Sequence, residues 1–512
     1  MAAVVTDQFR ILNAGNFIDS VSDTNNSYYA FLGFANPTSP NPGFGRTSNW
    51  DTNTPNPVDN FQYISHYRDS SLFGKKVTSA NVRRVIRKVD WTSNTAYDMY
   101  RHDYSIYNPT PISRTSRLYD ANYYVVNSDY RVYICIDNGS SGTNPTGGRS
   151  LDEPTFTDVD PSSAGSSGDG YIWKYLFSVA PSDIIKFDST EYVVVPNDWA
   201  TSTNTDIQTI REGGDSEVND NQIKKVYIED GGSGYTAGTY DILGDGSGGE
   251  VSITVNSSGT ITGTSIVSGG KGYTYGIVDL KRTGTISNPA KLIPIIPPSR
   301  GHGYDVYTEL GTDKVLIYAR FDDSTKDFPI DTQFSQIGLI KNPQQFASTS
   351  IFTENAFSSL YAIKLANSYT GTPVIGDRIT QSVTGGTAQG YVASYDSDTK
   401  VLKYYQDRSL YFSNDVDQTD ANDVGTVSKV LSFSGSNNIS FDAGGSASIN
   451  TSFSDSSVLV DNKQINLGVT FSSGLANPEI NKKTGDVIYI NNRPLIERNI
   501  RQKEDVKIIL EF

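Results

Sequence analysis

The sequence predicts an all-β protein made mainly of short strands and long coils. Hydrophobic residues make up 36% and charged residues 19% of the 512 residues, both below the globular averages of roughly 45–50% and 25%. Glycine, serine, threonine and asparagine fill the difference and disfavour helices, because they cost backbone entropy or compete for backbone hydrogen bonds. The best patterned segments alternate with a period of two, whereas helical periodicity is weak. Residues 354–366 fit a helix and a strand about equally well.

Three segments read as strands by their β-branched content and alternation. Residues 131–138 place Val132, Ile134 and Ile136 on one face and end at an Asn138-Gly139 turn signal. Residues 191–196 form a valine run that a proline stops, and residues 505–512 alternate apolar with polar side chains up to the last residue.

The most informative strand lies in residues 166–179, where period two gathers four aromatic side chains on one face. Each such ring buries about 150–250 Å² when it is covered. We expect a core strand between two layers; a subunit-interface strand and a sugar-binding platform are the alternatives. Lys174 lies on the opposite face, and if it is exposed to solvent its replacement by alanine should cost little. The four aromatic residues are Tyr171, Trp173, Tyr175 and Phe177.

Two stretches differ in composition from the rest of the chain, and we interpret both as β-rich insertions. Residues 203–287 contain a duplication, because residues 225–236 recur as residues 263–274, each a short strand followed by Gly-Gly-x-Gly-Tyr-Thr. The glycines suit turns with positive φ, and the tyrosine can cover the bare backbone. Residues 369–456 read as a β-meander followed by a polar Ser/Asn-rich part, with turns at 384–386 and 396–398.

Net charge and the scarcity of reactive residues exclude several classes of function. The chain carries a formal charge of −15 with a pI of about 4.7, so it repels phosphate backbones and we expect no nucleic-acid partner. We find no run of about 18 apolar residues and no signal-peptide pattern, and we therefore expect no membrane partner and assembly in a cytoplasm. One cysteine and three histidines leave little room for a metal cage.

No motif predicts catalysis or a cofactor. The glycines of residues 244–249 match GxGxxG, but the segment after them reads as a strand, so no helix N-terminus is available for a pyrophosphate. Acidic residues are abundant without a marked pair. The acidic cluster at 415–424 lacks EF-hand spacing and is at most a casual surface ion site. We therefore expect no catalytic, cofactor-binding or metal-binding residues, no cofactor and no enzyme.

The only dense positive run is the segment of residues 83–88, which contains Arg83, Arg84 and Arg87. A nucleic-acid site would need interleaved aromatic residues and more charge. We expect a strand whose arginines form salt bridges or face an interface.

Four blocks of this sequence resemble the baseplate wedge subunit of T-even-like contractile-tailed bacteriophages, the product of their gene eight. The blocks are RRVIRKVDW at 83–91, GDGYIWKYLFSVAP at 168–181, EYVVVP at 191–196, and the C-terminal block at 485–512 with its Asn-Arg-Pro. Weaker similarity covers residues 27–37 and 334–343, and all six blocks occur in the order of the family.

This resemblance implies a two-domain, layered β-sandwich protein in which the second domain is inserted in the first. Domain I would be residues 1–90 and 320–512, and domain II residues 91–319, with both β-rich insertions as extra elements. It implies a structural protein of the virion tail that forms a homodimer and contacts other wedge subunits. The interface or core candidates are Tyr171, Trp173, Tyr175, Phe177, Arg83, Arg84, Arg87 and Arg493.

Two other classes of function stay open at this stage. A glycan-binding tail or fibre accessory protein would use exposed tyrosine and tryptophan side chains, and it should be retained on a polysaccharide column. A cell-wall-degrading tail enzyme would need a carboxylate pair in a cleft and would show in zymography. Neither class predicts the six ordered blocks.

Overall fold

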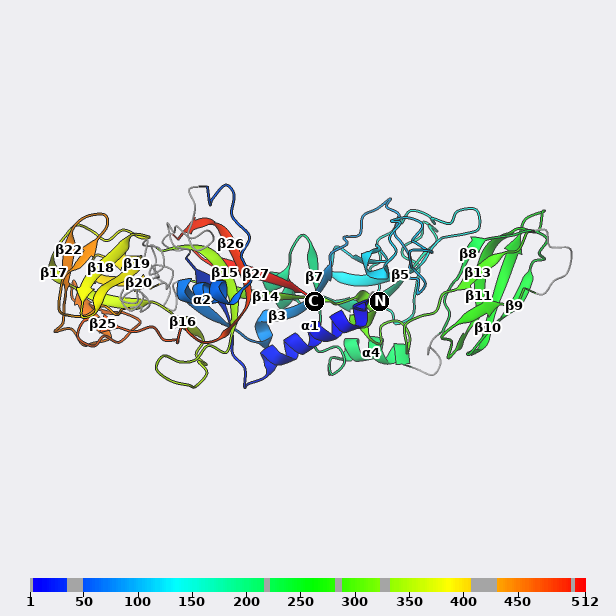
Figure 1. Ribbon diagram of the computed structural model, residues 1–512. Coiled ribbons are helices and arrows are strands. Elements are labelled where there is room, and N and C mark those ends of the chain that lie inside the picture. The colour runs from blue at the N-terminus through cyan, green and yellow to red at the C-terminus, as the bar shows by residue number, and fades with distance from the viewer. Residues whose placement is uncertain are drawn as a thin grey trace. The chain divides into compact units, whose positions relative to one another are not determined.

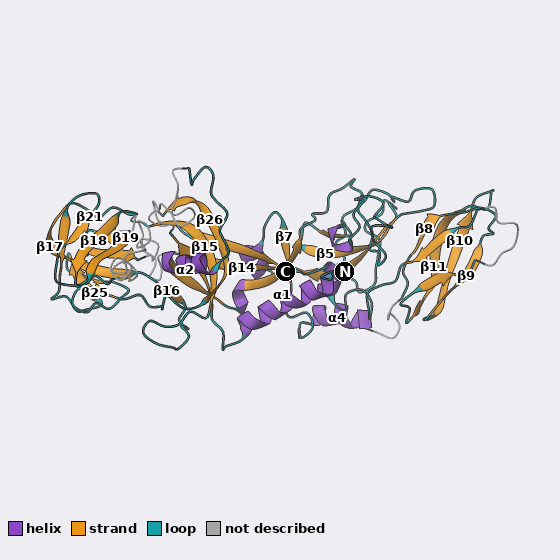
Figure 2. Cartoon of the chain, viewed as in Figure 1, coloured by secondary structure: helices purple, strands orange, loops and turns teal. Residues whose placement is uncertain are grey.

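The structure is a computed structural model that describes residues 3–34, 49–215, 222–280, 288–322, 332–406, 431–498 and 502–512. Strands account for most of its regular structure (Figure 2), and they form several separate sheets. The predicted all-β class is therefore confirmed.

The chain divides into two compact units. Unit 1 comprises residues 1–16, 83–316 and 509–512, and unit 2 comprises residues 17–82 and 317–508. The assignment of residues 1–90 with 320–512 and of residues 91–319 to two domains stays a prediction.

An aromatic sheet of three antiparallel strands in the order β4-β5-β6 forms part of the core of unit 1. Both β5 and β6 lie in the segments that sequence periodicity marks as strands. Across them Tyr133 faces Tyr175, and Cys135 faces Trp173. The bounds are Tyr124–Val126 for β4, Arg131–Asn138 for β5 and Tyr171–Ser178 for β6.

The duplicated segment of unit 1 forms a small β-module with its own apolar core (Figure 1). The hydroxyl of Tyr273, in the second Gly-Tyr-Thr copy, donates to the Ile242 carbonyl at 2.7 Å and accepts from the Gly249 amide at 3.0 Å. A Cβ at Gly249 would stand only 2.8 Å from that oxygen, so the tyrosine does cover bare backbone. The module contains the order β11-β10-β9-β12 and the pair β13-β8. Its bounds are Val226–Asp230 (β8), Gly238–Gly244 (β9), Ser247–Val255 (β10), Ile261–Lys271 (β11), Gly276–Val278 (β12) and Lys291–Pro294 (β13).

Unit 2 contains a five-stranded antiparallel sheet in the order β16-β2-β1-β15-β26. Tyr29 and Phe31 of β1 pack with Ile340 of β15 in one buried cluster. Phe31 fits because Gly338 opposes it across the sheet, where a Cβ would come within 2.2 Å of the ring. The bounds are Tyr28–Gly33 (β1), Ser71–Val77 (β2), Gln333–Lys341 (β15), Ala356–Ser358 (β16) and Asp486–Glu497 (β26).

A closed β-barrel in unit 2 contains most of residues 369–456 and begins before them, at Tyr361; that these residues are an insertion stays a prediction. Strands β17, β22, β21, β18, β19 and β20 pair in turn, and β20 pairs back with β17, while β25 extends from β17. Closure removes the free edges that short polar strands would otherwise expose. Its interior is apolar, with Ile363, Ile379 and Leu402 fully buried. The bounds are Tyr361–Thr370 (β17), Arg378–Val383 (β18), Gly386–Asp396 (β19), Val401–Tyr405 (β20), Ile439–Phe441 (β21), Ser446–Ile449 (β22) and Leu475–Ala476 (β25); a separate hairpin joins Ser457–Val460 (β23) to Lys463–Asn466 (β24).

A further sheet has the order β27-β14-β3-β7. The basic strand β3 pairs antiparallel with the valine strand β7, so that Arg87 faces Tyr192 and Arg84 faces Val195. Two of the blocks that carry the family resemblance are thus neighbours in one sheet. The bounds are Val82–Arg87 (β3), Tyr192–Val195 (β7), Lys314–Phe321 (β14) and Glu504–Glu511 (β27).

The described residues contain five α-helices that the sequence pattern did not reveal. The longest, α1, buries Ile11, Ala14, Ile18 and Val21 on one face. Apart from the half-buried Phe17, its other positions are polar, small or exposed, so the apolar stripe is too narrow to stand out from a Ser/Asn-rich sequence. Residues 354–366, which were ambiguous in the sequence, contain no helix; they hold β16 and the first part of β17. The helices are Asp7–Ser22 (α1), Phe61–Ser70 (α2), Pro181–Phe187 (α3), Thr205–Asp215 (α4) and Val306–Leu310 (α5), with short 3₁₀ turns at Ser79–Asn81 (η1) and Leu118–Asp120 (η2).

The condition set for Lys174, exposure to solvent, is not met. Its side chain is 4% exposed, and Leu176 beside it on the same face is 1% exposed. The ammonium donates to the Val159 carbonyl, and burial lowers the pKa of Lys174 to about 8. Strand β6 is therefore covered on both faces, and alternation alone does not distinguish one covered face from two.

Removal of the β-module gives a test of its independence. We expect a chain in which two glycines replace residues 226–294 to stay soluble and folded, because the Ile295 amide already donates to the Lys225 carbonyl at 2.9 Å and the ends meet. A deletion from Asp206 would remove α4, whose Ile210 is buried. Circular dichroism and cooperative melting would check this. An insoluble product, with point variants still soluble, would make the module part of the main core.

Candidate assembly groove

A groove of about 420 Å³ lies in unit 1. Its lining residues come from the end of β3, from η2, from β4, from the start of β7 and from the α5–β14 connection. Three tyrosines and seven charged side chains make this lining amphipathic. The lining residues are Ile86, Arg87, Lys88, Arg117, Tyr119, Asp120, Tyr124, Glu191, Tyr192, Leu310, Gly311, Asp313 and Lys314.

Ion pairs hold the charged wall of the groove in place. Arg117 contacts three carboxylates, those of Asp7 at 2.8 Å, Asp313 at 3.2 Å and Asp120 at 3.4 Å. Lys314 contacts Asp313 at 2.8 Å and also reaches the Glu511 carboxylate at 3.3 Å. A network of this kind fixes long side chains more firmly than an isolated surface pair does.

The opposite corner of the groove depends on a glycine. Gly311 ends α5 with φ of +67°, and a Cβ there would lie 2.4 Å from the ring of Tyr119. The Tyr119 hydroxyl donates to the Thr308 carbonyl at 2.5 Å. The positive φ and the close approach both require glycine, so the ring can lie flat against the chain.

Arg87 offers hydrogen-bond donors to a partner. It is exposed, and its guanidinium donates to two backbone carbonyls, those of Ala121 at 3.0 Å and Asp120 at 3.3 Å. A guanidinium has five N–H donors, so donors remain beyond these two bonds. Tyrosine and arginine are the residue types enriched at protein interfaces, and the groove combines both.

The four predicted aromatic residues meet on one buried face of β6. Trp173 stacks on Tyr171, with ring centroids 5.4 Å apart at 17°, and Tyr175 packs on Tyr133 at 5.6 Å. Phe177 contacts the indole of Trp199 edge-on. The exposed fraction of each of the four is 6% or less. In this chain they are core residues, which removes the sugar-platform interpretation of the strand; an interface role stays a prediction.

The predicted arginines lie in different settings. Arg83 pairs with Asp183 at 2.9 Å, and Arg84 lies over the ring of Tyr307 at 4.1 Å. Both are partly buried, so they stabilise unit 1 internally. Arg87 lies in the groove and is exposed. Arg493, in unit 2, is also exposed, and its carbonyl accepts a hydrogen bond from the Trp50 indole at 2.7 Å. Of the basic run, only Arg87 is exposed.

The described residues contain no cluster of three or more His, Cys, Asp or Glu side chains that could hold a metal ion. His302 is buried and pairs with the buried Glu309 at 2.5 Å, and Cys135 is fully buried. The acidic cluster at 415–424 lies outside the described residues. No described helix has the length and apolar content needed to cross a membrane.

Comparison with known proteins identifies the relatives of this chain. The family model for bacteriophage T4 Gp8 matches residues 134–228. The resemblance to the Gp8 family is confirmed. Baseplate wedge protein gp8 of Enterobacteria phage T4 is 25% identical over 230 residues, which is 38% of this chain and 60% of the T4 protein.

The Gp8 match covers most of β5 and all of β6 and β7, and it reaches into β8. It therefore includes the aromatic strand and β7, whose Tyr192 lines the groove. Sequence reasoning missed Arg117, Tyr119 and Lys314, the other groove residues that matter most here. They stand in two separate segments, 117–119 and 314, and no local pattern links them to residues 83–88.

Proposed function

We propose that this chain is a structural component of a contractile-tail phage baseplate wedge and resides in the virion tail. The observation that carries the proposal is the match of the Gp8 family model to residues 134–228. The similarity to a baseplate wedge protein over 60% of that protein's length supports the same structural role and the same location. We further propose that the chain is not an enzyme, since the family it resembles serves as a building block.

Locating the chain in purified virions tests the role directly. A peptide epitope inserted after Ser258, in the exposed β10–β11 turn, should label the baseplate in electron micrographs. Label on the head, or virions that lack the chain, would overturn the proposal. A virion reconstruction at side-chain resolution would also show which wedge subunits it contacts.

The groove is the surface that we propose for contact with another wedge subunit. Its tyrosines and its exposed arginine suit a protein partner. Its ion-pair network holds the charged side chains in position before binding, which lowers the entropy cost of association. It is lined by Arg87 and Tyr192, each of which lies in a block that resembles the family.

Charge reversal in the groove should weaken assembly without unfolding the chain. Arg87→Glu should reduce association with the other wedge subunits at least tenfold, because a like-charge juxtaposition costs several kcal/mol at an interface. Arg149→Glu is the matched control, since Arg149 is also exposed and donates to a backbone carbonyl, at 2.8 Å. Sedimentation of the reconstituted wedge measures both. Equal losses, or none, would remove the groove from the interface.

We propose that the chain forms a homodimer, as the resemblance implies. A two-fold contact is isologous, so each patch meets its own copy. Light scattering at micromolar concentration should give about twice the 55.9 kDa of one chain. A mass that stays monomeric over a tenfold rise in concentration would contradict the dimer.

The structure removes the main argument for a glycan-binding role, which came from the sequence. The aromatic side chains that suggested it are buried on β6. Retention of the protein on a polysaccharide column would restore this alternative.

A further inference from the structure

A tight turn in unit 1 presents two large apolar side chains to water. Ile106 is 75% exposed and Tyr107 is 91% exposed. They are the central residues of a turn in which Ser105 and Asn108 exchange backbone hydrogen bonds, both at 3.1 Å. A single exposed apolar residue is normal on a protein surface, but two neighbours at the end of one closed turn form a convex apolar surface. We call Ile106 and Tyr107 the apolar tip.

Side-chain hydrogen bonds fix the turn that carries the apolar tip. The Ser105 hydroxyl accepts from the amides of Tyr107 at 3.3 Å and Asn108 at 3.2 Å. The Asn108 side-chain amide donates to the Asp103 carboxylate. A turn that is fixed before binding loses little conformational freedom when it binds, which lowers the cost of association.

The base of the turn is tied to the core through Asp103. Arg101 is buried and donates to both oxygens of the Asp103 carboxylate at 2.9 Å. The Arg101 guanidinium also lies 4.1 Å from the ring centroid of Tyr227 and 5.2 Å from that of Tyr104. A buried ion pair therefore fixes the position of a turn whose own tip lies in water.

The sequence around the apolar tip is uncharged. No Asp, Glu, Lys or Arg occurs from Tyr104 to Ser113, although 19% of the chain is charged. Depletion of charge together with exposed aromatic residues is typical of the core of a protein interface, and tyrosine is common among the residues that dominate binding energy. A surface that complements the tip must be concave and uncharged.

We propose that the apolar tip inserts into an uncharged pocket on a different protein of the same baseplate. This inference rests on the proposed baseplate role, because it takes the partner from the same particle. It adds a second contact surface to the groove. A contact between the tips of two copies would join two convex surfaces and would bury far less than the roughly 800 Å² per partner of a standard interface.

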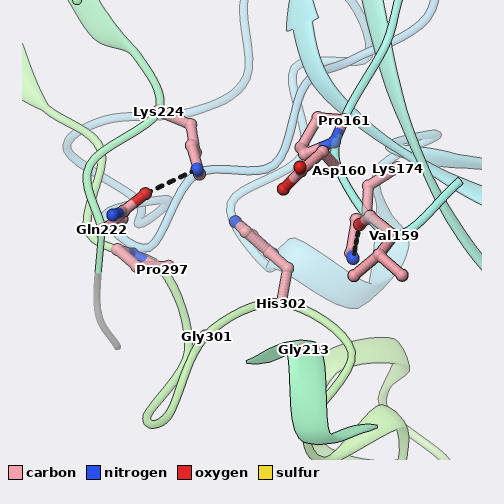
Figure 3. Close-up of a pocket in the computed structure, with 10 residues that line it drawn as sticks. All are labelled: Val159, Asp160, Pro161, Lys174, Gly213, Gln222, Lys224, Pro297, Gly301 and His302. Carbon is pink, nitrogen blue, oxygen red and sulfur yellow. Dashed lines mark hydrogen bonds between the residues drawn. The ribbon is translucent and has the colours of Figure 1, made fainter. Parts of the chain in front are cut away.

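Neither of the two cavities described in unit 1 suits the tip of a second copy. The groove is lined by seven charged side chains. The other cavity has a volume of about 30 Å³, enough for about two water molecules but not for a tyrosine ring. Figure 3 shows Lys224, Asp160 and His302 pointing toward its space, so it is polar as well. These mismatches favour a different protein over a second copy.

A photo-cross-linking side chain at the tip tests the contact. With p-benzoylphenylalanine in place of Tyr107, irradiation of purified virions should join the tip to one short stretch of another baseplate protein, located by mass spectrometry. The same side chain in place of Tyr275, a 60% exposed tyrosine of the β-module, is the control and should not reach that stretch. A cross-link to a second copy of this chain, or none although the virions contain the chain, would overturn the tip contact and leave the baseplate role intact. Virions that lack the chain would overturn both.

Competition for places in the particle measures how much the tip contributes. In host cells that supply the wild type and a variant in equal amounts, Ile106→Ser combined with Tyr107→Ser should enter virions about tenfold less often or worse. Tyr107→Phe, which keeps the ring, should hold an equal share. Because both side chains are exposed, both variants should melt as the wild type does. An equal share for the serine variant would overturn the proposal. Flotation of the wild type with phosphatidylcholine vesicles, lost in the serine variant, would overturn it in favour of a membrane partner.

Discussion

Trp173→Ala should lower the free energy of unfolding by about 3–5 kcal/mol, because it opens a cavity in the aromatic sheet. The indole is 0% exposed, stacks on Tyr171 and meets Tyr97 edge-on with ring centroids 5.8 Å apart. A loss of this size is a large part of the roughly 5–15 kcal/mol that stabilises a domain. Thermal and urea unfolding would measure it, and assembly should fall only as far as folding does.

Trp173→Phe is the control that separates the ring from the indole nitrogen. In the described part of the chain no acceptor lies within hydrogen-bonding distance of Trp173 Nε1. Phenylalanine keeps an aromatic ring in the stack and removes this unsatisfied donor, so it should cost less than half as much as alanine. If Trp173→Ala left the melting temperature unchanged, the core assignment would fall and the glycan-binding alternative would rise above it.

Asp103→Asn should cost about 3 kcal/mol, because it leaves a buried guanidinium without its counter-charge. Arg101 is 1% exposed, and its Nε and Nη2 each donate to one Asp103 carboxylate oxygen at 2.9 Å. Its guanidinium also lies 4.1 Å from the ring centroid of Tyr227, on β8 of the module. Urea unfolding of the variant would measure the loss.

A second pair with the same geometry provides the control. Arg320 donates to both carboxylate oxygens of Asp505, at 2.6 and 2.8 Å, but both side chains are more than 40% exposed. Because water solvates exposed charges, Asp505→Asn should change the melting temperature little. Arg101→Met added to Asp103→Asn should recover stability, since it removes the unpaired charge. Equal losses at Asp103 and Asp505 would show that burial is not the cause.

Local sequence pattern was sufficient for the strands that have strong β-propensity. Residues 131–138 and 191–196 form β5 and β7 because β-branched side chains favour extended backbone and a turn or a proline marks the end. The Gly-Tyr-Thr repeat likewise predicted a tyrosine packed over glycine backbone, because only a residue without a Cβ leaves room for the ring. The blocks that resemble the Gp8 family could also be recognised in the sequence, because each is a continuous run of residues.

Helix α1 and the partners of Arg101 could not be predicted from local sequence pattern. The helix is specified by four apolar residues that need a neighbouring surface to bury them, and its intrinsic helical preference is weak. Arg101 and Asp103 are two apart in sequence, a spacing that by itself indicates neither a buried nor an exposed pair. The large energetic effect comes from the segments that exclude water around them.

The amino-acid sequence by itself determined the all-β class, the aromatic strand and the resemblance to the baseplate wedge family. Each of these depends on contacts between residues that are near in sequence, or on an ordered string of residues. Only the tertiary structure decided that Lys174 is buried, that Arg117 joins three carboxylates, and that one groove unites residues from 86 to 314. These features arise where segments distant in sequence exclude water and bring charges together. Such long-range packing produces no periodic pattern in the local sequence.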